Sequence, residues 1–255
     1  MKGPFRADHV GSLLRPESLL EKREEWKAAK ISDAELRDYE NGCIADIVEK
    51  EQAVGIKSVT DGEYRRESFH FDFINQIGGI QTNFNLKSAF AQGEKTKAGG
   101  EKAVPLTVEI KDRMTLPAAG IGVENYKYLA SVASGDSTPK VTMPSPTMTH
   151  FRGGRDAISR EAYPELEDFF ADLSALYRQE ISLLAEAGCK YIQFDDTNLA
   201  YLCDSKMRQD ARDRGEDPDE LPRTSAALIN DCIKDRPADM AACIHLCRGN
   251  ARSLW

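Results

Sequence analysis

Short runs of β-forming residues alternate with long amphipathic helical patterns along most of this chain. Parallel strands need a crossover connection, usually a helix, so this alternation favours a parallel sheet with helices over a sandwich or a helical bundle. The sequence therefore predicts an α/β fold of the TIM-type (β/α)-barrel class. The five predicted strands cover residues 5–11, 57–61, 139–143, 191–195 and 240–246.

Amphipathic patterns in the intervals predict the helices. The second of them opens with Ser32 as an N-cap and Glu35 three residues later, which is the pattern of a capping box. A charged stretch over 208–222 has the composition of turns. The predicted helices cover residues 16–30, 32–54, 65–76, 123–133, 161–187 and 224–234.

Residues 77–118 interrupt this rhythm with paired glycines and with alternating apolar and polar residues. Such alternation is typical of half-buried strands, so we expect an inserted β-hairpin here. No solenoid repeat and no low-complexity linker divides the chain, which predicts a single domain over residues 1–255. Because a closed barrel of this type has eight strands, we expect the barrel to be incomplete at its C-terminus, as in a truncated chain.

Composition argues against several classes of function. The formal net charge of −8 disfavours a nucleic-acid partner. No apolar stretch approaches the ~20 residues of a membrane span and the first residues lack the apolar region of a signal peptide, so we expect a cytoplasmic protein. The six cysteines are widely spaced in a long chain, so we expect reduced thiols, some of them available to a metal.

His245 and Cys247 stand at the end of the last predicted strand. Residues two apart on a strand point to the same side, so an imidazole and a thiolate converge there. Zinc takes both donors in tetrahedral sites, although two ligands alone hold it poorly. The alternative is a buried cysteine beside a hydrogen-bonded histidine, and Cys243, on the same strand face, is either a further ligand or core packing.

Two adjacent carboxylates, Asp195 and Asp196, end the preceding apolar strand, where barrel enzymes carry their active-site groups. Strand alternation sends the two side chains to different sides. We expect Asp195 to face the barrel interior and to anchor a substrate ammonium. We expect Asp196 to cap the following segment through an Asx-type hydrogen bond.

Three further segments follow predicted strands. In 60–66, Gly62 permits a tight turn and Glu63 can enter the barrel mouth, or else serve as an acid in the first turn of a helix. In 9–16, Ser12 offers a hydroxyl group to a carboxylate. In 143–150, two prolines fix an extended loop that can equally be a plain connector.

In this order, these segments resemble the catalytic barrel of cobalamin-independent methionine synthase, and in particular the short single-barrel relatives of that family. The whole chain takes part, and the final His-x-Cys matches the zinc-binding pair of the family. Asp61 stands where the family has a histidine, and Asp196-Thr197 where it has Glu-Pro. The matching segments are 10–12, 61–63, 144–147, 192–196 and 245–247.

The resemblance implies a zinc-dependent methyltransferase that moves a methyl group from 5-methyltetrahydrofolate, or a related donor, to the thiol of homocysteine to form methionine. It implies that His245 and Cys247 bind Zn²⁺. It also implies that Ser12, Glu63 and Asp195 hold the amino-acid end of homocysteine, with Glu63 and Asp195 as the catalytic pair. The family takes its other zinc ligands, a Glu and a Cys, from later strands, so the resemblance predicts an incomplete site in these 255 residues.

Alternative functions stay open. One is zinc-dependent alkyl transfer to another thiol, and a second is a catalytically incomplete barrel that acts as a binding protein. A metal-free decarboxylase is more distant, because it leaves His245 and Cys247 without a task. We expect a small-molecule thiol and a methyl donor as partners, no nucleic acid, no membrane, and association into a homo-oligomer through unpaired strand edges.

Overall fold

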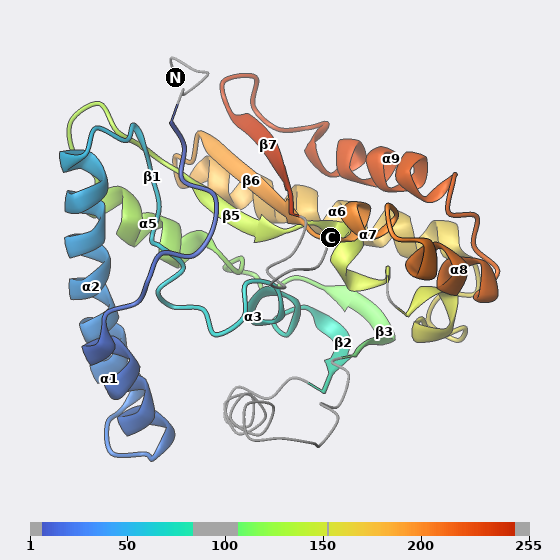
Figure 1. The fold of residues 1–255 in the computed structure, drawn as a ribbon, viewed down its shortest axis with the longest axis horizontal. Helices are drawn as coiled ribbons and strands as arrows, with labels where there is room; N and C mark the ends of the chain where they lie inside the picture. The colour runs from blue at the N-terminus through green and yellow to red at the C-terminus, as the bar shows by residue number, and fades with distance from the viewer. Residues whose placement is uncertain (1–6, 84–106, 152, 248–255) are drawn as a thin grey trace.

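The computed structural model describes residues 7–83, 107–151 and 153–247 of the chain. The parallel strands lie in the middle of the molecule with helices around them, and an antiparallel pair lies toward the lower edge of the view (Figure 1). The central strand is β6 (Tyr191–Asp196), which pairs in parallel with β5 (Val141–Pro144) on one side and with β7 (Ala241–Leu246) on the other. All three lie within two residues of the strands expected from the sequence.

A second parallel pair, β1 (Ser58–Val59) and β4 (Thr138–Pro139), continues this sheet. Only Lys140 separates β4 from β5, and its backbone N–H donates to the Val59 carbonyl at 2.8 Å. The parallel strands therefore follow one another in space in chain order, with helices between them, as in consecutive β/α repeats. The α/β prediction is confirmed, whereas barrel closure, its incompleteness and the single domain stay predictions.

The helices follow the amphipathic patterns closely. Ser32 forms the predicted capping box of α2, since its hydroxyl accepts the Glu35 N–H at 3.2 Å and the Glu35 carboxylate accepts the Ser32 N–H at 2.8 Å. In the part of the chain that the structure describes, none of the helices has the length and apolar character of a membrane span. The helices are α1 (Glu17–Lys27), α2 (Asp33–Ala53), α3 (Phe71–Ile74), α5 (Val123–Val132), α6 (Leu166–Glu186), α7 (Asn198–Tyr201), α8 (Ser205–Asp213) and α9 (Leu221–Ile233), with 3₁₀ turns η1 (Pro146–Thr149) and η2 (Gly154–Ala157).

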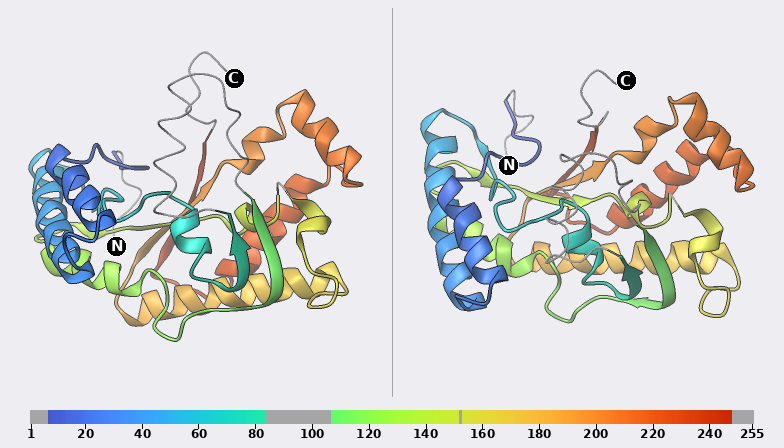
Figure 2. Two further views of the ribbon diagram at one scale, coloured as in Figure 1. Left: turned by 90° about the horizontal axis from the view of Figure 1, so that it is seen from below. Right: turned by 60° about the horizontal axis from the view of Figure 1, so that its bottom comes forward.

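The main hydrophobic core lies between the sheet and the long helix α6, which runs along one face of the sheet (Figure 2). Ile192 and Phe194 of β6 enter this core, and Leu228 of α9 joins it. The Phe194 ring meets the Tyr177 ring of α6 edge to face, with 5.8 Å between the ring centroids. A smaller core joins α1, α2, α5 and β1.

Strands β2 (Gly78–Thr82) and β3 (Val108–Thr115) form an antiparallel pair. They confirm the two strands of the hairpin predicted within 77–118. The stretch between them, 84–106, lies outside the described residues.

Three sequence predictions were wrong. Residues 7–11 form no strand, because Asp8 instead holds this segment by side-chain hydrogen bonds, and residues 5 and 6 lie outside the described part. The helix expected over 65–76 is reduced to α3, since the loop before it is held by distant arginines. The turn-rich stretch at 208–222 overlaps α8, which forms because the Asp204 side chain accepts the Met207 N–H at its N-terminus.

Candidate functional site

The loop after β1 turns sharply at Gly62 and Glu63, whose φ angles are 62° and 57°. A left-handed conformation at a residue other than glycine is uncommon and costs about 1–2 kcal/mol, so such strain is a reason to suspect a functional position. The Asp61 carboxylate accepts the Glu63 N–H at 2.9 Å and stabilises the turn. This turn buries the Glu63 side chain.

Two arginines from the N-terminal segment and α1 hold this strained loop. Arg15 Nη2 donates to the Glu63 carbonyl at 2.9 Å and to the Arg66 carbonyl at 2.7 Å. Arg23 donates to the Arg66 carbonyl at 3.1 Å and also to the Tyr64 carbonyl. These charge-assisted hydrogen bonds replace the helical pattern that the sequence predicts here.

Ser12 and Glu63 are in direct contact, as expected if both belong to one site. Ser12 Oγ donates to Glu63 Oε2 at 2.5 Å, and the Leu13 N–H donates to the Gly62 carbonyl at 3.1 Å. Arg66 Nη1 lies 3.8 Å from Glu63 Oε1. The N-terminal segment and the loop after β1 thus form one wall that presents a hydroxyl, a carboxylate and a guanidinium.

Asp195 ends the inner face of β6 and is only 6% exposed. Gln193 Nε2 donates to its Oδ1 at 2.6 Å, while its Oδ2 is buried without a hydrogen-bond partner. The pKa of Asp195 is raised to about 6, chiefly by burial and also by the negative charge of Glu63, and these outweigh the Gln193 hydrogen bond and the charges of Arg66 and His245, which lower it. A buried oxygen without a partner is a place where a ligand can donate.

Asp196 points to the other side of the sheet and caps the next segment, as predicted. Its Oδ1 accepts the N–H groups of Asn198 and Leu199 at 2.8 and 2.9 Å, and its Oδ2 accepts the Thr147 hydroxyl at 2.6 Å. Thr147 belongs to the proline-containing loop after β5, so this loop supports the end of β6 rather than acting as a bare connector.

His150, at the end of the same loop, packs against the rings of Phe169 and Phe170. Burial, together with the smaller effect of the nearby Arg214 charge, lowers its pKa to about 4. His150 is therefore a neutral, buried side chain at physiological pH, packed between aromatic rings.

His245 and Cys247 share the inner face of β7, and His245 lies directly beside Asp195 in the parallel register. The opposite face of β7 carries Leu246, which is 54% exposed, so the expected alternation is present. The Cys247 N–H donates to the Asp196 carbonyl at 2.9 Å, which extends the pairing of the two strands. The structure thus brings His245 into one neighbourhood with Asp195 and places Cys247 on the same side.

One nitrogen and one sulfur donor suit zinc, but a tetrahedral site needs four ligands. Across the described ranges, no group of three or more His, Cys, Asp or Glu side chains could hold a metal ion. Cys243, the alternative ligand, has its thiol 3.6 Å from the Tyr191 hydroxyl, and burial raises its pKa. The pair therefore fits two of four positions in a zinc site, and Cys243 belongs to the polar interior of the sheet.

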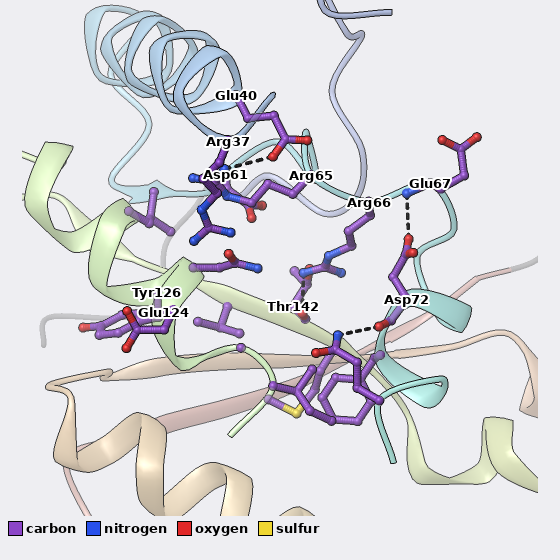
Figure 3. Close-up of a pocket in the computed structure, with 18 of the residues that line it drawn as sticks. Arg37, Glu40, Asp61, Arg65, Arg66, Glu67, Asp72, Glu124, Tyr126 and Thr142 are labelled. Atoms are coloured by element: carbon purple, nitrogen blue, oxygen red, sulfur yellow. Dashed lines mark hydrogen bonds and ion pairs between the residues drawn. The ribbon is translucent and has the colours of Figure 1, made fainter. Parts of the chain in front are cut away.

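A cavity of about 510 Å³ adjoins the site on the side of α2, α5 and β5 (Figure 3). Arg66 lines it, but none of the residues predicted for the site do. Charged side chains in its walls form ion pairs with one another. The Glu40 carboxylate lies 3.0 Å from the Arg65 guanidinium and 3.3 Å from that of Arg23. Arg66 is thus the link between this cavity and Glu63, and its Nη2 donates to the Thr142 carbonyl of β5.

Sequence reasoning missed three residues that shape the site: Arg66, Gln193 and Lys140. Strand alternation could have indicated Gln193, because it lies two residues before Asp195 on the same strand face. Lys140 had a weaker signal, a single charge at the start of an apolar run. Nothing local distinguishes Arg66 from its neighbour Arg65.

Comparison with known proteins gives a consistent result. Residues 5–253 match the model of the family described as the catalytic domain of cobalamin-independent synthase. The chain is 39% identical over 254 residues to uncharacterized protein YxjH and 40% identical over 255 residues to uncharacterized protein YxjG, both from Bacillus subtilis (strain 168). Each alignment covers 100% of this chain and 64% of the relative, so the chain spans about two thirds of their length.

More distant relatives carry a functional name. A protein named methionine synthase from Saccharolobus solfataricus is 26% identical over 194 residues, which is 74% of this chain and 52% of that protein. Among solved structures, a candidate vitamin-B12 independent methionine synthase from Listeria monocytogenes has a TM-score of 0.77 at 35% identity, over 98% of this chain and 67% of the other. A B12-independent methionine synthase from Shewanella sp. W3-18-1, solved with selenomethionine, has a TM-score of 0.59 at 18% identity, over 86% and 55%, and shows the fold alone.

Proposed function

This chain belongs to the family of the cobalamin-independent synthase catalytic domain, and we propose that it transfers a methyl group from 5-methyltetrahydrofolate, or a related donor, to the thiol of homocysteine. The observation that carries this proposal is the convergence of Ser12, Glu63 and Asp195 at the strand ends, with His245 beside them. The chain spans 64% of the length of these curated relatives, so an activity of the whole protein is stated as a proposal.

Glu63 and Asp195 would hold the ammonium group of the amino acid. An ammonium group has three donors and no acceptor, and Asp195 Oδ2 is a buried acceptor without a partner. The two carboxylates interact electrostatically, and a cation between them would relieve their repulsion. The Ser12 hydroxyl has one hydrogen, which it donates to Glu63, and it would turn from Glu63 to donate to the carboxylate of the amino acid once the ammonium is bound.

His245 and Cys247 would supply two ligands of a zinc ion on the same side of the sheet. Bound zinc would lower the pKa of the homocysteine thiol, so that a thiolate is present near neutral pH. In the net reaction the sulfur gains the methyl group, the N5–methyl bond of the donor breaks, and the thiol proton replaces the methyl group on N5. The task of this chain's own residues is to fix the amino-acid end, so that the sulfur reaches the end of β7 in one orientation.

The metal assignment is tested by zinc content per chain, measured by elemental analysis of the purified protein. We expect Cys247→Ser and His245→Ala to lose most of the zinc. Cys203→Ser, which changes an exposed cysteine on another segment, is the matched control and should retain it. Equal zinc in Cys247→Ser and in the unaltered protein would refute the ligand assignment.

The amino-acid site is tested by methionine formation as a function of homocysteine concentration. We expect Asp195→Asn and Glu63→Gln to raise the KM for homocysteine by roughly 10- to 100-fold, because each removes a buried partner of the ammonium, and to leave the zinc content unchanged. Glu49→Gln, an exposed acid on α2, is the control. Unchanged homocysteine kinetics in both site variants would exclude these carboxylates from the site.

The same assay distinguishes the rival thiol acceptors. A thiol without an ammonium group has no partner for Asp195 and Glu63, so it should be a poorer acceptor than homocysteine. A protein that prefers such a thiol, and whose preference survives Asp195→Asn, would instead be an alkyltransferase for another thiol.

A further inference from the structure

We propose that Lys140 is a positioning residue for the ammonium group of the ligand: it orients the Gln193 amide so that Asp195 keeps one carboxylate oxygen available. The identity of the ligand rests on the proposed function. The orientation itself rests on contacts within the described residues, so the two can be tested separately.

Lys140 lies between β4 and β5, and its side chain has no exposed surface. A lysine is almost never fully buried unless it is paired. Its Nζ donates to Asp8 Oδ1 at 2.9 Å, to Gln193 Oε1 at 3.1 Å and to the His9 carbonyl. An ammonium group has three donors and no acceptor, so these contacts use its full capacity.

This arrangement leaves Gln193 a single favourable orientation. Because Lys140 can only donate, the Gln193 carbonyl oxygen must face it, and Gln193 Nε2 then donates to Asp195 Oδ1 at 2.6 Å. A reversed amide would set its NH₂ group against the ammonium and its oxygen against the carboxylate, which are two repulsive contacts. The lysine therefore decides which group Gln193 presents to Asp195.

Lys140 is itself held from several elements, so it cannot easily follow a reversed amide. Asp8 also accepts the hydroxyl groups of Ser58 and, at 2.7 Å, of Tyr191. The Tyr191 ring lies 5.4 Å from Lys140 Nζ, within the range of a cation–π interaction. The residues that hold Lys140 in place thus come from the N-terminal segment, β1 and β6.

At the other end, the hydrogen bond from Gln193 occupies Asp195 Oδ1 and leaves Oδ2 as the buried acceptor without a partner. The charged groups around Asp195 are Glu63 on the loop after β1, Arg66 on the same loop, and His245 on β7. Because the Asp195 carboxylate is already oriented, it need not reorganise when a ligand ammonium binds. Residues that orient a binding side chain raise the affinity for the ligand in this way.

The first test compares methionine with 4-(methylthio)butanoate, which lacks only the ammonium group, by titration calorimetry. The unaltered protein should prefer methionine, and Asp195→Asn should lose that preference. Lys140→Met and Gln193→Met should each weaken methionine binding by about tenfold, as for one hydrogen bond to a charged group, with little change for the analogue. The double variant should be no weaker than Gln193→Met, because Lys140 acts through Gln193.

The second test needs no ligand. In ¹⁵N nuclear magnetic resonance spectra, the Gln193 side-chain NH₂ should exchange slowly with solvent in the unaltered protein and quickly in Lys140→Met. Unfolding temperatures check that both variants fold. If Lys140→Met does not fold, Gln193→Met, which leaves Lys140 its other two acceptors, carries the calorimetric comparison instead, because it has no side-chain NH₂ group to observe.

The outcomes separate the two ideas. Variants at 140 and 193 that keep the full preference for methionine, when Asp195→Asn loses it, would overturn the positioning role, as would unchanged protection of the NH₂ group in Lys140→Met. No preference for methionine in the unaltered protein would instead overturn the ammonium site of the proposed function, and with it the ligand part of this inference. The NH₂ exchange would then still decide the orientation of Gln193.

Discussion

The two faces of β6 use the same backbone for opposite purposes. On the face toward α6, Ile192 and Phe194 are buried in the main core, and Asp196 has both carboxylate oxygens hydrogen-bonded. On the other face, Gln193 leads to Asp195, whose Oδ2 has no partner. The adjacent carboxylates thus differ in pairing: Asp196 is fully used within the fold, whereas Asp195 keeps one buried oxygen that can accept a hydrogen bond from a ligand.

This contrast implies that the face of β6 toward α6 raises the free energy of unfolding, whereas the face with Gln193 and Asp195 lowers it. Burying a carboxylate without enough partners is unfavourable, and the raised pKa of Asp195 is a direct sign of that cost. Three changes to β6 test this difference, from the largest expected effect to the smallest.

Replacing Phe194 should have the largest effect on stability. Phe194→Ala removes a fully buried ring from the contact with Tyr177 and should lower the free energy of unfolding by about 4 kcal/mol, measured by urea denaturation. Leu246→Ala on the exposed face of β7 is the control, with an expected loss below about 1 kcal/mol. Similar losses in both variants would show that the core does not depend on this face.

Replacing Asp196 should come next. Asp196→Ala leaves the Asn198 and Leu199 N–H groups and the buried Thr147 hydroxyl without their acceptor, which should cost about 3 kcal/mol. Asp196→Asn retains one acceptor oxygen and should lose less. An alanine variant as stable as the unaltered protein would remove the structural role of Asp196.

Replacing Asp195 should have the smallest effect on stability, with the opposite sign. Its pKa is raised from 3.8 to about 6, so its contribution to stability is fully present below pH 3.8 and is lost as the pH rises through about 6. In metal-free protein, Asp195→Asn should match the unaltered protein near pH 4 and be more stable by roughly 2 kcal/mol near pH 8. The free energy of unfolding measured against pH checks this, and a less stable variant at pH 8 would contradict it.

Much of the fold was predictable because its signals are local. The runs that became β5, β6 and β7 were recognised within two residues, and the capping box at Ser32 follows from residues three apart. The errors occurred where distant groups override local preference. Residues 65–70 have a helical pattern, but Arg15 and Arg23 bind the carbonyls of Glu63, Tyr64 and Arg66, where the helix would begin, and hold the chain in another conformation.

The candidate site was predictable only in part. The residues themselves indicated Ser12 and Glu63 separately, and only the family resemblance put them in one site, because their hydrogen bond joins positions 51 residues apart, which no local pattern encodes.

The sequence by itself determined which way each side chain faces along β6 and β7, because strand alternation is a property of the local backbone. It thereby separated Asp195 from Asp196 and set His245 and Cys247 on one face. Only the tertiary structure decided what those side chains meet: the burial that raises the pKa of Asp195, and the lysine that orients Gln193. Those depend on contacts between β5, β6 and the N-terminal segment, which exist only when the chain is folded.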